Sequence, residues 1–253
     1  MDLQNKTALI TGATSGIGQA TARLFAEKGA RLIICGRRQD RLRALQKKLK
    51  AYTEVLTLQF DVRDKEAVFE KLQRLPNDFA PIDILINNAG NAHGLDPIQE
   101  GDPDDWDAML DSNVKGLLYV SKAVLPQMIR RKSGHIINVG SIAGKEVYPN
   151  GNVYCASKFA VDAISQGMRI DLNGLGIKVG TINPGLVETA FSEVRFKGDV
   201  ARAEKTYQNY TPLQPEDIAD IIWFAVTRPP HVNISDLTVM PLDQASCTIV
   251  NKK

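Results

Sequence analysis

The chain has 253 residues, and 31 Lys and Arg stand against 29 Asp and Glu, so the formal net charge is +2. This near balance argues against a nucleic-acid partner or a membrane-surface footprint, and 43% hydrophobic residues exclude a disordered or fibrous chain. The longest apolar run, residues 221–226, is far shorter than the roughly 20 residues that cross a bilayer. Because the N-terminal segment also lacks the pattern of a secretion signal, we expect a cytoplasmic protein. The three cysteines are widely spaced and form no CxxC pair, so neither disulfides nor a metal site is expected.

Short runs of β-branched and aliphatic residues alternate with stretches of helical periodicity. The predicted strands are residues 7–10, 31–35, 54–59, 82–86, 135–139, 177–182 and 237–240. The predicted helices are residues 16–28, 39–50, 65–75, 103–130, 153–173 and 215–227. This alternation predicts an α/β protein with a single-domain, Rossmann-like doubly wound fold, in which a seven-stranded parallel sheet carries helices on both faces.

No linker, repeat or charge block divides the chain, so residues 1–253 are expected to form one domain. Only residues 184–210 break the alternation, since they place many polar and charged residues between a strand and a late helix. A long insertion after a strand end is typical of an active-site lid, and we expect a substrate lid around residues 186–210.

A glycine-rich turn lies between the first strand and the first helix. Glycines there let the backbone approach a pyrophosphate, whose charge is met by free amides at the positive end of the helix. The alternative is a turn without a ligand, because the spacing departs from GxGxxG. The position between strand and helix favours the nucleotide, and the predicted cofactor contacts are Gly12, Thr14, Ser15, Gly16, Ile17 and Gly18.

Arg37 and Arg38 stand at the end of the second strand, where an NAD-selective site usually places an acid. A guanidinium instead makes a charge-assisted contact with a phosphate, worth about 1.5–3 kcal/mol per bond. The two arginines therefore favour NADP over NAD. The alternative is a solvated helix start.

Polar and small residues end the third and fourth strands, at the edge where a doubly wound sheet holds its ligand. The predicted cofactor contacts there are Asp61, Val62, Asn87, Ala89 and Gly90. Taken singly, each is also compatible with ordinary turn chemistry.

Tyr154 and Lys158 carry the catalytic signal. Residues four apart share a helix face with Cβ atoms about 5–6 Å apart, so the ammonium lies near the phenol. A free tyrosine has a pKa near ~10, and Lys158 together with an oxidised nicotinamide is expected to favour the tyrosinate. The alternative is a packed helix with a surface lysine.

Two further polar residues fit this chemistry. Ser141 follows the strand at 135–139 and is placed to hydrogen-bond the substrate oxygen beside Tyr154. Asn113 lies within the helix predicted at 103–130, where its low propensity indicates a kink or a bound water, unless it is a surface residue.

In this order and at these spacings, the motifs around Gly12, Asn87, Asn113, Ser141 and Tyr154 resemble the short-chain dehydrogenase/reductase family over essentially the whole chain. The resemblance implies that Tyr154 is the general acid/base and that Lys158 binds the nicotinamide ribose and lowers the tyrosine pKa. It also implies that Ser141 orients the substrate and that Asn113 completes a water-linked proton relay. Further cofactor contacts that it implies are Pro184, Gly185, Val187 and Thr189.

Residues 36–42, 151–154 and 191–199 look more narrowly like the NADP-dependent 3-hydroxy acid dehydrogenase subgroup. That likeness implies reversible hydride transfer between NADP(H) and the carbinol or carbonyl carbon of short acids such as serine, 3-hydroxyisobutyrate or malonic semialdehyde. The family resemblance also implies a homotetramer paired through helices, for which the apolar excess of residues 103–130 and 153–173 offers a surface. Deeper burial within a monomer is the alternative.

Arg195, in the predicted lid, is a candidate clamp for a substrate carboxylate, because a guanidinium matches a carboxylate geometrically. His93 is a second candidate for lining the substrate pocket, although a loop histidine is often only a polar side chain. Cys155 is not expected to act, because a helix turns it about 100° away from Tyr154.

Two other functions stay open at the level of sequence. The first is an NADPH-dependent carbonyl or ketone reductase for uncharged substrates, and the second is an NADP(H)-binding protein without turnover. The set of Tyr154, Lys158, Ser141 and Asn113 argues against the second.

Overall fold

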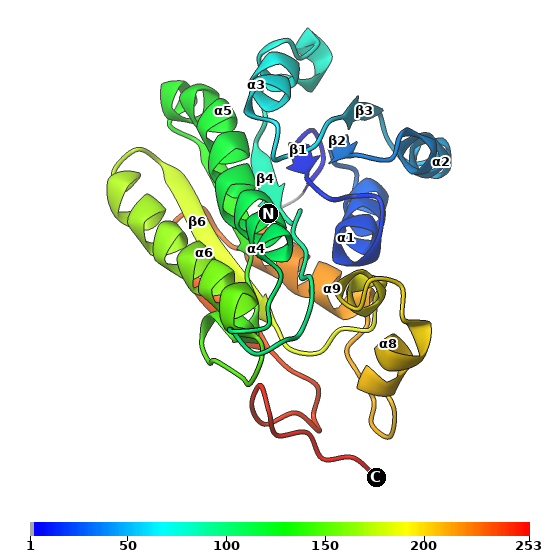
Figure 1. Cartoon of the computed structure of the whole chain (residues 1–253). Helices are drawn as coiled ribbons and strands as arrows, with labels where there is room; N and C mark the ends of the chain where they lie inside the picture. The colour runs from blue at the N-terminus through cyan, green and yellow to red at the C-terminus, as the bar shows by residue number, and fades with distance from the viewer. Residues whose placement is uncertain (1–2) are drawn as a thin grey trace.

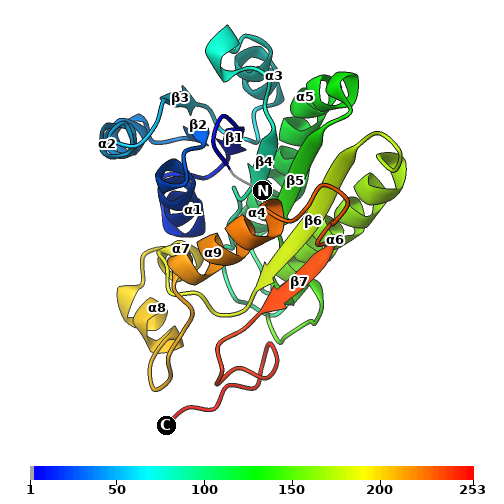
Figure 2. The ribbon, with the colours of Figure 1, turned by 180° about the vertical axis from the view of Figure 1, so that it is seen from behind.

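Seven strands among the described residues form one parallel sheet in the order β3-β2-β1-β4-β5-β6-β7 (Figures 1 and 2). The computed structural model describes residues 3–253. The strands are β1 (Thr7–Ile10), β2 (Arg31–Gly36), β3 (Val55–Gln59), β4 (Ile84–Asn87), β5 (Gly134–Val139), β6 (Ile177–Pro184) and β7 (Asp236–Val239). The predicted doubly wound class is confirmed, and the strand boundaries lie within two residues of the predicted ones.

Helices cover both faces of the sheet, as Figure 2 shows from behind. The longer ones are α1 (Gly16–Glu27), α2 (Gln39–Leu49), α3 (Lys65–Gln73), α4 (Pro103–Leu110), α5 (Gly116–Arg131), α6 (Asn152–Asp171) and α9 (Pro215–Val226). One apolar core contains residues of α1, α2 and α9, and the other contains residues of α3 and α5 with α6 packed against it. Along β1, Ala8 and Ile10 enter the first core and Leu9 enters the second. Burial on both faces explains why the strands read as continuous apolar runs.

The helix predicted at 103–130 is interrupted. Between α4 and α5 the backbone forms a π-helical segment, η2 (Asp111–Lys115), that contains Asn113. Such segments insert a wider turn into an α-helix and occur frequently at functional sites. The low helix propensity of asparagine therefore indicated a real irregularity in the chain.

The segment predicted as a lid is folded into two short helices, α7 (Phe191–Arg195) and α8 (Val200–Thr206). In Figure 1 α8 stands apart from the sheet, beyond the carboxyl ends of the strands. No helix within residues 3–253 is long and apolar enough to span a bilayer.

The strand order fixes where a ligand binds. From β1 the chain proceeds through β2 to β3 on one side, then returns to β4 on the other side of β1 and continues outward to β7. The crossovers diverge at β1 and β4, so a crevice opens at the carboxyl ends of these strands.

Candidate active site

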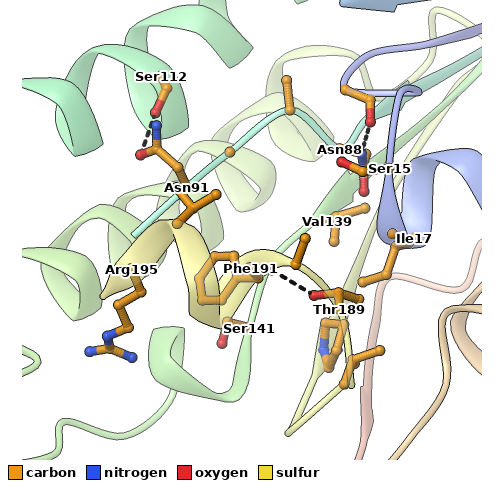
Figure 3. Close-up of a pocket in the computed structure, with 18 of the residues that line it drawn as sticks. Ser15, Ile17, Asn88, Asn91, Ser112, Val139, Ser141, Thr189, Phe191 and Arg195 are labelled. Carbon is orange, nitrogen blue, oxygen red and sulfur yellow. Dashed lines mark hydrogen bonds between the residues drawn. The ribbon is translucent and has the colours of Figure 1, made fainter. Parts of the chain in front are cut away.

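A cavity of about 410 Å³ opens at the carboxyl ends of the strands. The turn after β1 lines one side, with Ser15 and Ile17, and α7 lines the other, with Phe191 and Arg195 (Figure 3). Most predicted contact residues lie on its wall: Gly12, Thr14, Ser15, Gly16, Ile17, Arg37, Arg38, Asp61, Val62, Ala89, Gly90, Ser141, Tyr154, Lys158, Pro184, Gly185, Val187, Thr189 and Arg195. Gly18, Asn87, His93 and Asn113 do not line it.

The glycine-rich turn needs its glycines for two different reasons. Gly12 and Gly16 have φ values of +64° and +52°, a conformation that residues with a Cβ rarely adopt. Gly18 lies one turn into the helix, where an added Cβ would collide with the Asn88 side chain and the Gly12 carbonyl. Gly18 therefore permits close packing behind the cavity, which explains why this predicted contact residue is not on its wall.

Hydrogen bonds join the turn to the end of β4. The Thr11 hydroxyl oxygen accepts from the backbone amides of Asn88 at 3.0 Å and Ala89 at 2.9 Å, and the Asn88 side chain donates to the Thr11 carbonyl at 2.9 Å. Asn87 points away, because its amide donates to Ser121 and Asn138 at 2.9 Å each. Asn87 thus holds the strand end in place from within the protein.

Three guanidinium groups gather at one end of the cavity. Arg38 donates to the hydroxyls of Thr14 at 3.0 Å and Ser15 at 3.3 Å, while Arg37 is 63% exposed and lies 3.8 Å from Asp61. Burial lowers the pKa of Arg38, and repulsion from neighbouring arginines lowers it further. A local excess of positive charge of this kind favours a bound anion.

Arg63 is the third guanidinium, and sequence reasoning missed it. It makes hydrogen bonds of 2.7–3.1 Å to the Asp61 carboxylate. Burial pushes the pKa of Asp61 upward, but the bonds and charge of Arg63 outweigh it and lower the pKa overall. The only signal in the sequence was its place two residues after Asp61.

The chain's own residues fit a dinucleotide phosphate at this end. The positive-φ glycines leave open backbone at the start of α1, where amides and the helix dipole favour a pyrophosphate. Arg37 and Arg38 add cations at the end of β2, which suits an additional phosphate on the ribose better than a free hydroxyl.

Tyr154, Lys158 and Ser141 meet at the other end of the cavity. Tyr154 and Lys158 lie one turn apart on α6 and are 8% exposed each, with the ammonium 6.0 Å from the centre of the phenol ring. Lys158 donates to the Val139 carbonyl at 3.0 Å, which fixes it at the end of β5. Ser141 caps the short helix after β5, where its hydroxyl accepts from the Ala143 amide at 3.1 Å.

Burial controls the ionisation of this group. It raises the pKa of Tyr154, and a hydrogen bond with Ser141 acts in the opposite direction. It also lowers the pKa of Lys158 to about 8. Burial therefore decides the ionisation of Tyr154, and the lowering of its pKa that the sequence led us to expect from Lys158 is not seen. The protein alone holds Tyr154 as a protonated phenol.

Asn113 stands behind the cavity as a structural hub. Its amide donates to the Asn91 carbonyl at 2.8 Å and to Ser157 at 3.0 Å, and its side-chain oxygen accepts from the Asn91 amide at 2.8 Å. A Cβ at Gly90 would lie 3.0 Å from the Asn113 oxygen and 3.8 Å from the Lys158 ammonium. Gly90 therefore lies between the Asn113 and Lys158 side chains, where a larger residue would crowd both. A proton relay from Asn113 to Lys158 stays a prediction.

The lid brings Arg195 over the catalytic group. The centre of its guanidinium lies 5.3 Å from the Tyr148 ring and 5.6 Å from the Tyr154 ring, and its Nε donates to the Gly94 carbonyl at 3.3 Å. Its Nη2 is buried and has no hydrogen-bond partner within residues 3–253. A buried donor without a partner costs about 1–3 kcal/mol, so an anion placed against it is strongly favoured.

Two aromatic residues complete this end, and the sequence did not single them out. The Phe191 ring packs against Tyr154 with 5.7 Å between centres. Tyr148 rests where a side chain at Gly151 would collide with its ring. Burial raises the pKa of Tyr148 to about 12, against the effect of Arg195, so its phenol stays a hydrogen-bond donor.

The structure does not bring His93 into the cavity. It places the histidine in a separate hollow of about 10 Å³ on the far side of Arg195, together with Asp102 and Asp105. Burial lowers the pKa of His93, which leaves a neutral side chain there. Since Arg195 stands between His93 and the cavity, the predicted substrate contact is not supported by this geometry.

Known proteins share both the sequence and the fold. Residues 6–199 match the short chain dehydrogenase family. The NADP-dependent 3-hydroxy acid dehydrogenase YdfG of Salmonella typhi is 49% identical over 94% of this chain and 95% of its own length. The sulfoacetaldehyde reductase 2 of Chromohalobacter salexigens is 46% identical over 94% of each chain. The closed form of a serine dehydrogenase complexed with NADP+ superposes with a TM-score of 0.92 at 46% identity, over 98% of this chain and 99% of that one. The chain therefore belongs to the short chain dehydrogenase family.

Proposed function

We propose that this protein is an NADP-dependent dehydrogenase of short 3-hydroxy acids. It transfers a hydride reversibly between NADP(H) and the carbinol or carbonyl carbon of acids such as serine, 3-hydroxyisobutyrate or malonic semialdehyde. Relatives named as an NADP-dependent 3-hydroxy acid dehydrogenase and as a serine dehydrogenase support the reaction class. The observation that carries the substrate class is the buried, unpaired Nη2 of Arg195 above Tyr154.

Arg37 and Arg38 are the residues that would hold the additional phosphate of NADP, while the turn from Gly12 to Ile17 would hold the pyrophosphate. When bound, the cofactor's nicotinamide supplies or takes up the hydride. The contribution of the chain is to place the substrate carbon, exclude water and move one proton.

The proton moves through Tyr154. A phenol whose pKa is raised by burial is protonated at neutral pH, so it donates to the carbonyl oxygen during reduction and takes the proton back during oxidation. Ser141 hydrogen-bonds the same substrate oxygen and fixes its direction. Lys158 keeps its positive charge at neutral pH even with its pKa lowered to about 8, and this charge favours the tyrosinate when oxidation requires it.

The acid group of the substrate pairs with Arg195. Because the guanidinium lies on the rings of Tyr148 and Tyr154, it is held in one orientation beside the reacting oxygen. A carboxylate two bonds from the carbinol carbon reaches a cation at this position, whereas an uncharged substrate leaves the buried Nη2 unpaired.

A matched substrate pair tests the proposal. Oxidation by NADP is measured through the absorbance of the NADPH that forms. We expect kcat/KM for 3-hydroxyisobutyrate to exceed that for its methyl ester by at least about tenfold, because losing one charge-assisted bond costs about 1.5–3 kcal/mol. Equal rates on the acid and the ester would favour a carbonyl reductase for uncharged substrates. Tight NADPH binding without turnover of any hydroxy acid or aldehyde would favour a binding protein.

We further propose a cytoplasmic homotetramer. Helices α5 and α6 expose large apolar side chains, among them Leu118 at 41%, Phe159 at 42% and Ile170 at 75%. Such side chains on neighbouring helices are suited to a subunit interface. Light scattering on the purified protein tests this: a mass of about four chains is expected, and a monomer contradicts it.

A further inference from the structure

An ion-pair cluster fastens the lid to the loop that follows β4. The ammonium of Lys197, two residues beyond Arg195, lies 3.0 Å from the Asp105 carboxylate and 3.4 Å from that of Asp102. Asp105 belongs to α4, and its side chain is only 14% exposed. From these contacts we infer that Lys197 and Asp105 are positioning residues, which set Arg195 for the acid group of the substrate; the inference rests on the function proposed above.

Gly94 connects this ion-pair cluster to Arg195 through two hydrogen bonds. The Gly94 amide donates to the Arg195 carbonyl at 2.9 Å, and the Gly94 carbonyl accepts from the Arg195 side chain at 3.3 Å. Gly94 has a φ of +67°, and an added Cβ would lie 3.2 Å from the Asp105 carboxylate. The Asp105 carboxylate therefore pairs with the lysine of the lid and lies beside the glycine that holds the arginine.

The backbone of Lys197 supports a role for its side chain. Lys197 has a φ of +52°, in the left-handed region that favours glycine, and it is followed by Gly198 with a φ of +92°. The chain thus turns sharply at the end of α7, and the Gly198 amide donates to the Glu193 carbonyl at 2.9 Å. A glycine would be the less strained residue at position 197, but it would lack the ammonium that reaches Asp105.

The ion pairs of Lys197 favour one position of the lid over others. Arg195 meets the substrate only when α7 is seated on the loop at 91–102, and the ion pairs favour that seated position. Weakening them lowers the seated fraction, so the apparent affinity for an acid falls by the same factor. The chemical step at Tyr154 is unaffected once the acid is bound, so the effect appears in KM.

The test compares three variants at Lys197 on the acid and its methyl ester. Lys197→Met is expected to raise KM for 3-hydroxyisobutyrate about fivefold, the upper end of the range for an ion pair whose lysine side chain is 57% exposed, with kcat within about twofold. KM for the ester should change by less than about twofold, because the ester does not use Arg195. Lys197→Arg should restore most of the affinity for the acid.

Two controls separate positioning from folding. Lys197→Gly relieves the left-handed backbone, so we expect a melting temperature at least equal to the wild type together with the same rise in KM as Lys197→Met. Lys205→Met removes an equal charge from exposed α8, where Lys205 has no ion pair among residues 3–253, and should leave KM unchanged. In a double-mutant cycle, Asp105→Asn added to Lys197→Met should produce little further rise.

Three results would overturn the inference: an unchanged KM in Lys197→Met, an equal rise for acid and ester, or a KM that follows melting temperature across the three variants. Failure of the proposed function looks different. In that case the wild type itself would oxidise the acid and its methyl ester with equal kcat/KM, so Arg195→Gln would have no preference to remove. If Arg195→Gln abolishes the preference and Lys197→Met does not weaken it, only the positioning role is wrong.

Discussion

The two ends of the cavity are built in different ways. The cofactor end consists of strand ends and a glycine turn that backbone hydrogen bonds hold together, such as those from Asn88 and Ala89 to Thr11. The substrate end includes a lid of two short helices whose side chains reach back to α4 and to the loop after β4. The reacting group stands between them, on the long helix α6.

This difference separates the residues proposed to transfer the proton from the residue proposed to select the substrate. Tyr154, Ser141 and Lys158 are fixed by α6 and by the end of β5, so in the proposed mechanism they present the same proton donor to any carbonyl that enters. Arg195 is fixed by its contact with Gly94, and in the proposed function its buried Nη2 selects for an anion. Changes at the first group should therefore remove turnover on all substrates, and changes at the lid should alter the choice among them.

The largest effect is expected at Tyr154. Tyr154→Phe keeps the ring against Phe191 but removes the proton that the phenol exchanges with the substrate oxygen. General acid/base groups contribute about 10²–10⁴-fold, so kcat should fall by that factor on acids and neutral carbonyls alike. NADPH binding, measured by fluorescence, should stay near wild type. Turnover above a tenth of the wild-type rate would show that another group carries the proton.

The next effect concerns the cofactor end. Among residues 3–253 the one ion pair of the Arg37 guanidinium is a long contact of 3.8 Å to Asp61, which leaves this group available to a phosphate. Replacing Arg37 with Ala should weaken NADPH by about 10- to 100-fold, the equivalent of one charge-assisted bond, and leave NADH nearly unchanged. Arg41→Ala removes a neighbouring charge from the exposed side of α2 and serves as the control. An equal loss of both cofactors in Arg37→Ala would place the phosphate elsewhere.

A smaller effect lies outside the cavity, in the acid stability of the fold. His135 on β5 is buried, neither ring nitrogen has a partner in residues 3–253, and burial lowers its pKa to about 3. Between pH 6.5 and 3, His135 is protonated in the unfolded chain but stays neutral in the folded chain. The free energy of unfolding therefore falls by about 1.4 kcal/mol for each pH unit below 6.5.

Urea unfolding at pH 7 and at pH 5 measures this. The fall in stability between the two pH values should shrink by about 2 kcal/mol in His135→Leu, because leucine binds no proton in either state. His231→Leu, at an exposed loop position, should retain the wild-type fall. The same pH dependence in wild type and His135→Leu would place the acid sensitivity on other groups.

The sequence was most informative where periodicity and strand ends decide the structure. The seven strands and the positions of Tyr154, Lys158 and Ser141 follow from local pattern, because every parallel strand directs its carboxyl end to one edge. Even the irregularity at Asn113 had a local signal in its poor helix propensity.

The rest depends on contacts between distant segments, which periodicity does not encode. Nothing near His93 in the sequence indicates that Arg195 stands between it and the cavity, because that contact joins segments about a hundred residues apart. Tyr148 and Phe191 were missed for the same reason, since an aromatic residue outside a long periodic segment has no pattern until its neighbours are known. The ionisation of Tyr154 also depends on burial, which the spacing to Lys158 does not reveal.

The most direct test of this division is the ratio of kcat/KM for 3-hydroxyisobutyrate to that for its methyl ester, in the wild type and in Arg195→Gln. The ratio should fall at least about tenfold toward one in the variant, with the ester rate changed by less than about twofold, since only the acid loses a charge-assisted bond. If acid and ester instead lose rate by the same factor, Arg195 supports the site as a whole and the lid does not select the substrate.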